Sequence, residues 1–158
     1  MPRKILLIVG VFMLALLLAA CKAGSPGKGE SKMMNWVKHD MSVRNKTETN
    51  PLASSADTLK DGREAFSHYC VVCHGLDGQN TGVPFADRMS PPVPSLAGNE
   101  VQSYTDGQLK WIIDNGISPS GMPGSKGILS DDEIWSIVIY LRHLPPAGSL
   151  GEPEMYSH

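Results

Sequence analysis

This chain of 158 residues has few aromatic side chains, few cysteines and no excess of basic charge. Aromatics make up 6% of it, so side chains alone would form a thin core, which indicates that another group fills part of the interior. Its 14 basic residues do not outnumber its 16 acidic ones, which excludes the basic surface typical of nucleic-acid binders. The length suits one modest domain rather than a two-domain enzyme. Glycine (16) and proline (12) are plentiful and indicate much irregular chain.

The first twenty residues have the pattern of an export signal. Arg3 and Lys4 precede an uncharged apolar run over 5–20, which is short for a membrane-spanning helix. The run ends in small residues directly before Cys21, the pattern of a bacterial lipobox, in which the cysteine is lipidated and becomes the new N-terminus. The alternative is an uncleaved signal anchor with an incidental cysteine. Both predict that the rest of the chain lies outside the cytoplasm, facing the periplasm or the cell exterior, and is tethered to a membrane.

Composition divides the rest of the chain into an extension, a domain and a tail. Residues 21–56 have no sustained apolar periodicity and include a stretch rich in Gly, Ser and Lys, which predicts a lipidated tether. Residues 57–145 carry the helical patterns and predict a single domain. Residues 146–158 predict a frayed tail.

Three segments of the domain have the apolar spacing and the end signals of helices. The first begins near Asp57, with Ser55 or Asp57 as its cap. The second begins at a capping box over 105–108 and ends at 115–116. The third begins at a stronger capping box over 130–133 and is stopped by Pro145. Glycine- and proline-rich chain over 75–103 and 116–129 predicts long ordered loops, which tend to be functional in compact domains.

The motif that carries chemistry is Cys70-Val71-Val72-Cys73-His74, a C-x-x-C-H attachment signature for c-type haem. Two thiols near a helix end can add to the two vinyl groups on one edge of a porphyrin, and the next residue then lies under the ring, where its imidazole binds the iron. One alternative is a disulfide with a neighbouring histidine. A zinc half-site would need a second Cys/His pair, and the remaining cysteine is Cys21. Thioredoxin-like chemistry would need a βαβ context, which is missing.

Over about residues 57–145 the sequence resembles the class I c-type cytochromes, of the small monohaem bacterial kind. The matching patterns are Gly62-x-x-x-Phe66-x-x-x-Cys70-x-x-Cys73-His74-Gly75 for the first helix and haem site, and 130–142 for the last helix. The resemblance implies an all-α fold of three main helices with long loops wrapped round one covalently bound haem c. It also implies that the first and last helices cross near Gly62 and an aromatic residue of the last helix, here Trp135 or Tyr140.

A second iron ligand is expected downstream of the motif. The candidates are Met89, Met122, Met155, His143 and His158. Met122 lies in a Gly/Pro loop just before the last helix, similar to the methionine loop of the family, and a thioether ligand raises the reduction potential. Met89, also in a loop, is its rival. His143 lies within a helix, where we expect it to be solvated.

The resemblance implies three further residues round the haem. In the family a proline carbonyl in a P-x-L-x-G stretch orients the ligating imidazole, and Pro94-Ser95-Leu96-Ala97-Gly98 matches that pattern. Pro94 and Leu96 are therefore candidate contacts of the cofactor. Trp111, on the middle helix, is a candidate wall of the haem crevice, with ordinary core packing as the alternative.

The leading functional hypothesis is a one-electron carrier, because iron held by His74 and Met122 has no open position. The lipid tether would confine it near membrane oxidoreductases, either as a free carrier or as a subunit, with redox proteins as partners and no nucleic acid. The alternative is an enzyme or gas sensor with a five-coordinate haem. A third hypothesis is a mainly structural role in which residues 22–56 anchor an assembly.

Overall fold

The computed structural model describes residues 43, 45–89, 91–117 and 120–156. The predicted signal segment, the predicted lipidation site at Cys21 and the candidate ligand His158 lie outside the described residues. In the part of the chain that the structure describes, no helix is long and apolar enough to cross a membrane.

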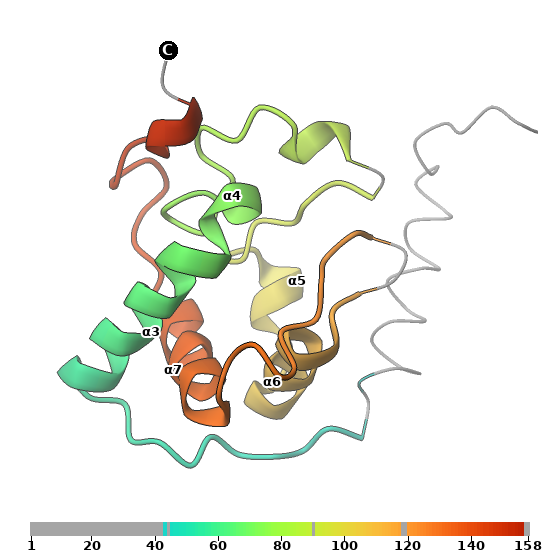
Figure 1. Cartoon of the computed structure of the whole chain (residues 1–158), viewed down its shortest axis with the longest axis vertical. Helices are drawn as coiled ribbons and strands as arrows, with labels where there is room; N and C mark the ends of the chain where they lie inside the picture. Colours follow the sequence, from blue (N-terminus) through green and yellow to red (C-terminus); the bar gives the residue numbers. More distant parts are fainter. Residues whose placement is uncertain (1–42, 44, 90, 118–119, 157–158) are drawn as a thin grey trace, which may run out of the picture.

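The described residues form a small helical domain (Figure 1). Its helices are α3 (Ala56–Tyr69), α4 (Val71–His74), α5 (Asn99–Gln102), α6 (Asp106–Asn115) and α7 (Asp131–Arg142), with 3₁₀ turns η2 (Ala86–Arg88) and η3 (Glu154–Tyr156). Within these ranges there is no strand, and β-pairing is confined to two isolated bridges. Three helices are long and two are single turns, so the predicted all-α fold with three main helices is confirmed.

Helices α6 and α7 begin at the capping boxes that the sequence predicts, and of the two caps expected for α3, Ser55 or Asp57, the structure has Ser55. Ser55, Thr105 and Ser130 each accept a hydrogen bond from the amide three residues on, and the side chain at that position bonds back to the amide of the cap. Each box satisfies two amides that the first turn leaves unpaired. At its other end α7 stops at Arg142, three residues before Pro145, because a residue that precedes proline is kept out of the helical region.

Helices α3 and α7 cross in direct backbone contact at Gly62 (Figure 1). A Cβ atom on Gly62 would lie 2.0 Å from the carbonyl oxygen of Ser136, where no side chain can fit. Close to the crossing, the rings of Phe66 and Tyr140 pack with their centroids 5.2 Å apart. The contact predicted near Gly62 is therefore with the α7 backbone at Ser136, next to Trp135 and one turn before Tyr140.

Helix α7 is the centre of the hydrophobic core, because residues 134–141 are all buried. One set of its side chains packs with α3 and α4, and the other packs with α6 and Val43. The first cluster contains Ala65, Phe66, Val71, Leu129, Ile134, Ile137, Tyr140 and Leu141, and the second contains Val43, Val101, Tyr104, Leu109, Trp135 and Val138. With apolar groups on both sides, α7 fixes how the rest of the domain is arranged.

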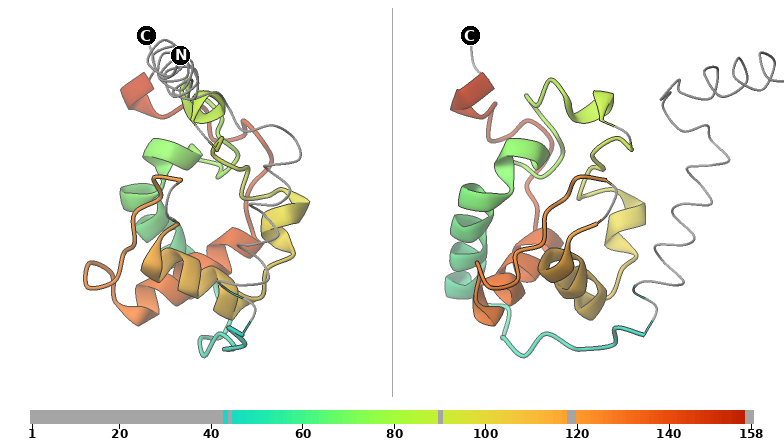
Figure 2. Two further views of the ribbon diagram at one scale, coloured as in Figure 1. Left: turned by 90° about the vertical axis from the view of Figure 1, so that its right-hand side faces the viewer. Right: turned by 45° about the vertical axis from the view of Figure 1, so that its right-hand side comes forward.

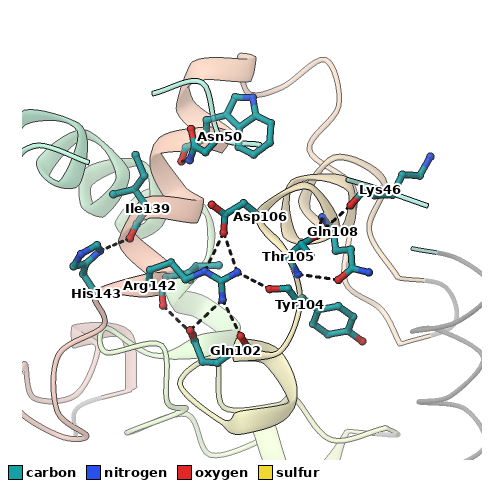
Figure 3. A network of polar contacts seen from close by, with 12 residues as sticks. Lys46, Asn50, Gln102, Tyr104, Thr105, Asp106, Gln108, Ile139, Arg142 and His143 are labelled. Atoms are coloured by element: carbon teal, nitrogen blue, oxygen red, sulfur yellow. Dashed lines mark hydrogen bonds and ion pairs between the residues drawn. The ribbon is translucent and has the colours of Figure 1, made fainter. Parts of the chain in front are cut away.

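Part of the predicted tether packs on the domain. The chain before α3 runs along the base of α7 and α6 (Figure 1). Val43 is 2% exposed and its carbonyl accepts a bond from the Gln108 side chain at 3.3 Å, while the Thr105 hydroxyl donates to the Lys46 carbonyl at 3.1 Å (Figure 3). The Asn50 amide donates to the Trp135 carbonyl at 2.9 Å. The described residues of the extension before the α3 cap, 43 and 45–54, therefore form a belt with fixed contacts.

The expectation of a frayed tail is wrong for residues 147–156. The amide of Gly148 donates to Asp77 Oδ2 at 2.7 Å, and the Tyr156 hydroxyl donates to the Val72 carbonyl at 2.9 Å. The ring of Tyr156 also lies 5.9 Å from that of Phe85. The sequence predicted fraying because the tail has no apolar periodicity. The tail is held instead by a few separate polar and aromatic contacts with distant segments, and such contacts leave no periodic pattern.

The substitution Gly62→Ala should destabilise the holoprotein by about 2 kcal/mol, since the added methyl group must push α3 and α7 apart. Urea denaturation of the purified protein measures this. Ser67→Ala, at an exposed position of the same helix, is the matched control and should change stability by no more than about 0.5 kcal/mol. Equal stability of the two variants would contradict a close crossing at Gly62.

Candidate functional site

The C-x-x-C-H motif forms a single tight turn at the end of α3. Cys70 closes α3 with its amide bonded to the Phe66 carbonyl at 2.9 Å, and it is at the same time the N-cap of α4. The amides of Cys73 and His74 both donate to the Cys70 carbonyl, at 3.2 and 3.0 Å. This turn brings the two cysteines and the histidine close together. Both thiols are half-buried and free.

Burial controls the protonation of this turn. It raises the pKa of the Cys70 thiol to about 12, and the neighbouring Cys73 adds to the effect. It lowers the pKa of His74 to about 4, against the opposing effect of the Pro94 carbonyl. At neutral pH His74 is therefore an uncharged imidazole, which is the form that binds a metal.

The imidazole of His74 lies next to Pro94 without a fully formed hydrogen bond. The Pro94 carbonyl is near enough to raise the pKa of His74, yet the buried Nδ1 atom of the ring has no hydrogen-bond partner of normal geometry. The contact between the two residues is therefore weaker than an ordinary hydrogen bond. Nδ1 is nevertheless a buried polar atom that needs an acceptor for its N–H. An imidazole that binds a metal through its other nitrogen has the same need.

Met122 lies in a loop that is closed at its base. Gly116 is the C-cap of α6, and its φ of 69° lies in the left-handed region. A Cβ atom on Gly116 would lie 2.4 Å from the Met122 carbonyl oxygen. The amide of Ile117 donates to the same carbonyl at 3.0 Å. In Figure 1 this loop stands across the middle of the domain from α4. Met122 is half-buried, in a loop whose two ends are joined by these contacts.

The rival ligand Met89 ends beside the same loop. Its methyl carbon lies 3.6 Å from where a Cβ on Gly121 would be. The structure therefore brings the two loop methionines, Met89 and Met122, to neighbouring positions. Met155 is 58% exposed and His143 is exposed as the C-cap of α7, with its Nδ1 atom 2.8 Å from the Ile139 carbonyl.

The other predicted contact residues border the interior in different ways. Leu96 is half-buried against both hydrophobic clusters, and its amide donates to the Gly78 carbonyl at 2.8 Å. Trp111 packs against the second cluster with the Lys46 ammonium 5.5 Å from its ring centroid. Figure 2 shows the five helices and the connecting loops arranged round the middle of the domain.

Two surface pockets of about 490 and 510 Å³ lie away from the motif. The first lies between α3 and the start of α7 and is lined largely by carboxylates, and the second lies beside the belt. Neither is lined by Cys70, Cys73, His74 or Met122. Among the described residues no group of three or more His, Cys, Asp or Glu side chains is placed to hold a metal ion, so the zinc alternative finds no donor set there.

Asp77 is a residue of this site that the motif analysis missed. It is fully buried three positions after His74, and it accepts bonds from the Gln79 amide at 2.8 Å, the Thr81 hydroxyl at 2.5 Å and the Gly148 amide at 2.7 Å. Burial acts to raise the pKa of Asp77, but these hydrogen bonds outweigh it and hold the pKa below its ordinary value. Its position in a Gly-rich turn was the available signal, because Asp side chains bond the backbone of such turns.

A C-x-x-C-H turn that closes the first helix of a small all-α domain defines the class of protein: a class I c-type cytochrome. A family model described as "Cytochrome C oxidase, cbb3-type, subunit III" matches residues 57–141. The match covers more than half of the chain, which therefore belongs to this family. The predicted cofactor, a covalently bound haem c, is confirmed, and the two thiols and the neutral imidazole fit it.

Two curated relatives carry related segments. A thiosulfate dehydrogenase of Psychrobacter arcticus is 28% identical over 117 residues, which cover 71% of this chain and 35% of the relative. The cytochrome c subunit of the quinone-dependent alcohol dehydrogenase of Gluconobacter oxydans is 34% identical over 105 residues, which cover 60% of this chain and 20% of the relative. The chain thus spans about a third and a fifth of their lengths. The family match supports the prediction of a cytochrome c domain that transfers electrons.

The variant Asp77→Asn should unfold more easily than the unsubstituted protein by about 2 kcal/mol at pH 7, because charge-assisted hydrogen bonds are lost. The folded-state pKa of Asp77 is depressed, so its stabilising effect is complete above the unfolded value of 3.8 and is lost as the pH falls through the folded-state pKa. Denaturation curves at pH 7 and pH 3 test this. The difference between the two proteins should narrow at the lower pH, and a constant difference would argue against an ionised Asp77.

Proposed function

We propose that this chain is an exported, membrane-tethered one-electron carrier that serves, or forms a subunit of, a respiratory oxidoreductase. Cys70 and Cys73 would hold the haem through thioether bonds, and His74 and Met122 would be the ligands of its iron. The observation that carries the proposal is the turn in which a half-buried, uncharged imidazole follows two free thiols. When bound, the haem supplies an iron that alternates between the ferrous and ferric states.

Each residue of the proposed site has a task in this arrangement. The Pro94 carbonyl orients the imidazole of His74 and increases its basicity. The thioether of Met122 is a soft ligand that favours the ferrous state and raises the potential. Leu96 and Trp111 present apolar surface to the haem and keep water from it, which also favours the less charged state of the site.

The partners follow from this chemistry and from the relatives. With His74 and Met122 both bound, no position remains for a substrate, so electrons pass to and from other redox proteins. The related proteins are an oxidase subunit, a thiosulfate dehydrogenase and a subunit of a quinone-dependent dehydrogenase. We therefore propose a membrane oxidoreductase as the donor or acceptor.

Replacing Met122 with alanine should remove the sixth ligand. The ferric protein should lose the weak thioether-to-iron band at the red end of its spectrum, the ferrous protein should bind carbon monoxide readily, and the reduction potential should fall. Absorption spectroscopy and a potentiometric titration measure these changes. Met89→Ala is the matched control, because Met89 ends beside the same loop.

The assignment of the ligand is decided by which variant changes. If Met89→Ala abolishes the thioether band while Met122→Ala keeps it, Met89 is the ligand. If the unsubstituted protein is high-spin and binds carbon monoxide, the iron is five-coordinate and the enzyme or sensor alternative replaces the carrier.

The tether is tested at Cys21. The unsubstituted chain should incorporate a labelled fatty acid and the variant Cys21→Ser should not, since no lipid can be attached without the thiol. Metabolic labelling of cells that express each full chain measures this. An unsubstituted chain that stays in the membrane fraction without label would indicate an uncleaved signal anchor instead.

A further inference from the structure

Asn80 carries two structural costs that its neighbours do not. It is the one non-glycine residue at positive φ in the described ranges, with a φ of 64°. Its Oδ1 atom is buried without a hydrogen-bond partner, and the other such side-chain atom in those ranges is Nδ1 of His74. Backbone strain and an unpaired buried oxygen persist only where the surrounding structure enforces them, which points to a function for this position.

The contacts of Asn80 join the main chain of His74 to the segment that carries Pro94. Its backbone amide donates to the carbonyl of His74 at 2.8 Å. Its side-chain amide donates to the carbonyl of Val93 at 2.8 Å, and Val93 immediately precedes Pro94, whose carbonyl acts on the His74 ring. Asn80 thus bonds both the main chain of His74 and the residue directly before Pro94, whose carbonyl lies near the His74 ring.

The conformation of Asn80 is enforced by the residues on either side of it. The backbone N–H of Gln79 and the hydroxyl of Thr81 both donate to the buried carboxylate of Asp77. At Gly75 a Cβ would lie 2.9 Å from the Thr81 carbonyl, so the turn also packs directly against the end of α4. The backbone on either side of Asn80 is therefore held in place, and the Asn80 side chain points toward the carbonyl of Val93.

We propose that Asn80 is a positioning residue that sets the orientation and basicity of the His74 imidazole by holding Pro94, through the carbonyl of Val93, beside the ring. This inference rests on the proposed function, because it assumes that His74 binds the haem iron. A carbonyl kept close to the ring N–H makes an imidazole a stronger donor to the metal and stabilises the ferric state. Asn80 therefore holds the reduction potential down, in opposition to Met122.

The test compares two substitutions at Asn80 with a matched control in the same turn. Asn80→Gly removes the side chain and keeps positive φ free of strain, whereas Asn80→Ala removes the side chain and keeps the strain. Gln79→Ala is the control, because it removes a bond of the same kind and length, from Gln79 Nε2 to the Pro145 carbonyl at 2.8 Å. That bond joins the turn to the chain after α7 and contacts neither His74 nor Val93. All three are made in the full haem-loaded chain.

Both Asn80 variants should shift the ferrous–ferric equilibrium toward the ferrous state by about tenfold, which is about 59 mV for one electron. They should also change the g-values in the electron paramagnetic resonance spectrum of the ferric protein, which report the orientation of the imidazole plane. Gln79→Ala should leave the potential and the g-values unchanged. If Asn80→Ala does not fold, Asn80→Gly carries the test, since glycine adopts this φ without cost.

The inference is overturned if Asn80→Gly keeps the potential and g-values of the unsubstituted protein, or if Gln79→Ala shifts them equally. The first result would make Asn80 a structural turn residue, and the second would make the effect a general loosening of the turn. Both leave the proposed function intact. A spectrum of the unsubstituted protein without histidine-ligated haem would overturn the inference together with the proposed function.

Discussion

The close crossing of α3 and α7 at Gly62 is the constraint on which the rest of the domain depends. With no side chain at Gly62, the two backbones meet at the Ser136 carbonyl, and α7 becomes buried on several sides. The direction of α3 is thereby set, and α3 ends in the turn that holds Cys70 and His74. The position of the proposed haem site thus follows from a packing contact two helical turns away.

The connecting segments complete the domain by binding to this frame at single points. The belt lies on α6 and α7, and the tail over 147–156 bonds Val72 within the motif and Asp77 in the turn that follows it. Both use backbone carbonyls and amides as partners, and neither has the periodicity of a helix. A chain with few aromatics and many glycines can build a stable small domain in this way, provided that the haem supplies apolar contact in the middle.

Two groups near the motif oppose one another in the proposed mechanism. The thioether of Met122 favours the ferrous state, while an acceptor held on the ring of His74 favours the ferric state. The first group comes from the loop before α7 and the second from the loop between η2 and α5. Since different segments carry them, the potential of such a carrier can be adjusted by changes in either loop without disturbing the helices.

The sequence predicted the elements whose signals are local. The capping boxes at Ser55, Thr105 and Ser130 act within one turn, and the C-x-x-C-H motif needs only the geometry of one helical end, so both are visible in the chain itself. The family comparison confirms the class and the haem c that this motif predicted. The roles of Met122, Pro94, Leu96 and Trp111 remain predictions.

What the sequence by itself determined is therefore the class of protein, its cofactor, and the starts of its helices. Only the tertiary structure decided that Met89 ends beside the loop that carries Met122, that Asp77 is buried and that the tail is anchored to it, because these contacts join residues far apart along the chain. The strain at Asn80 also belongs to this second group. A left-handed asparagine with an unpaired buried oxygen is imposed by the segments that surround it, and no local pattern encodes it.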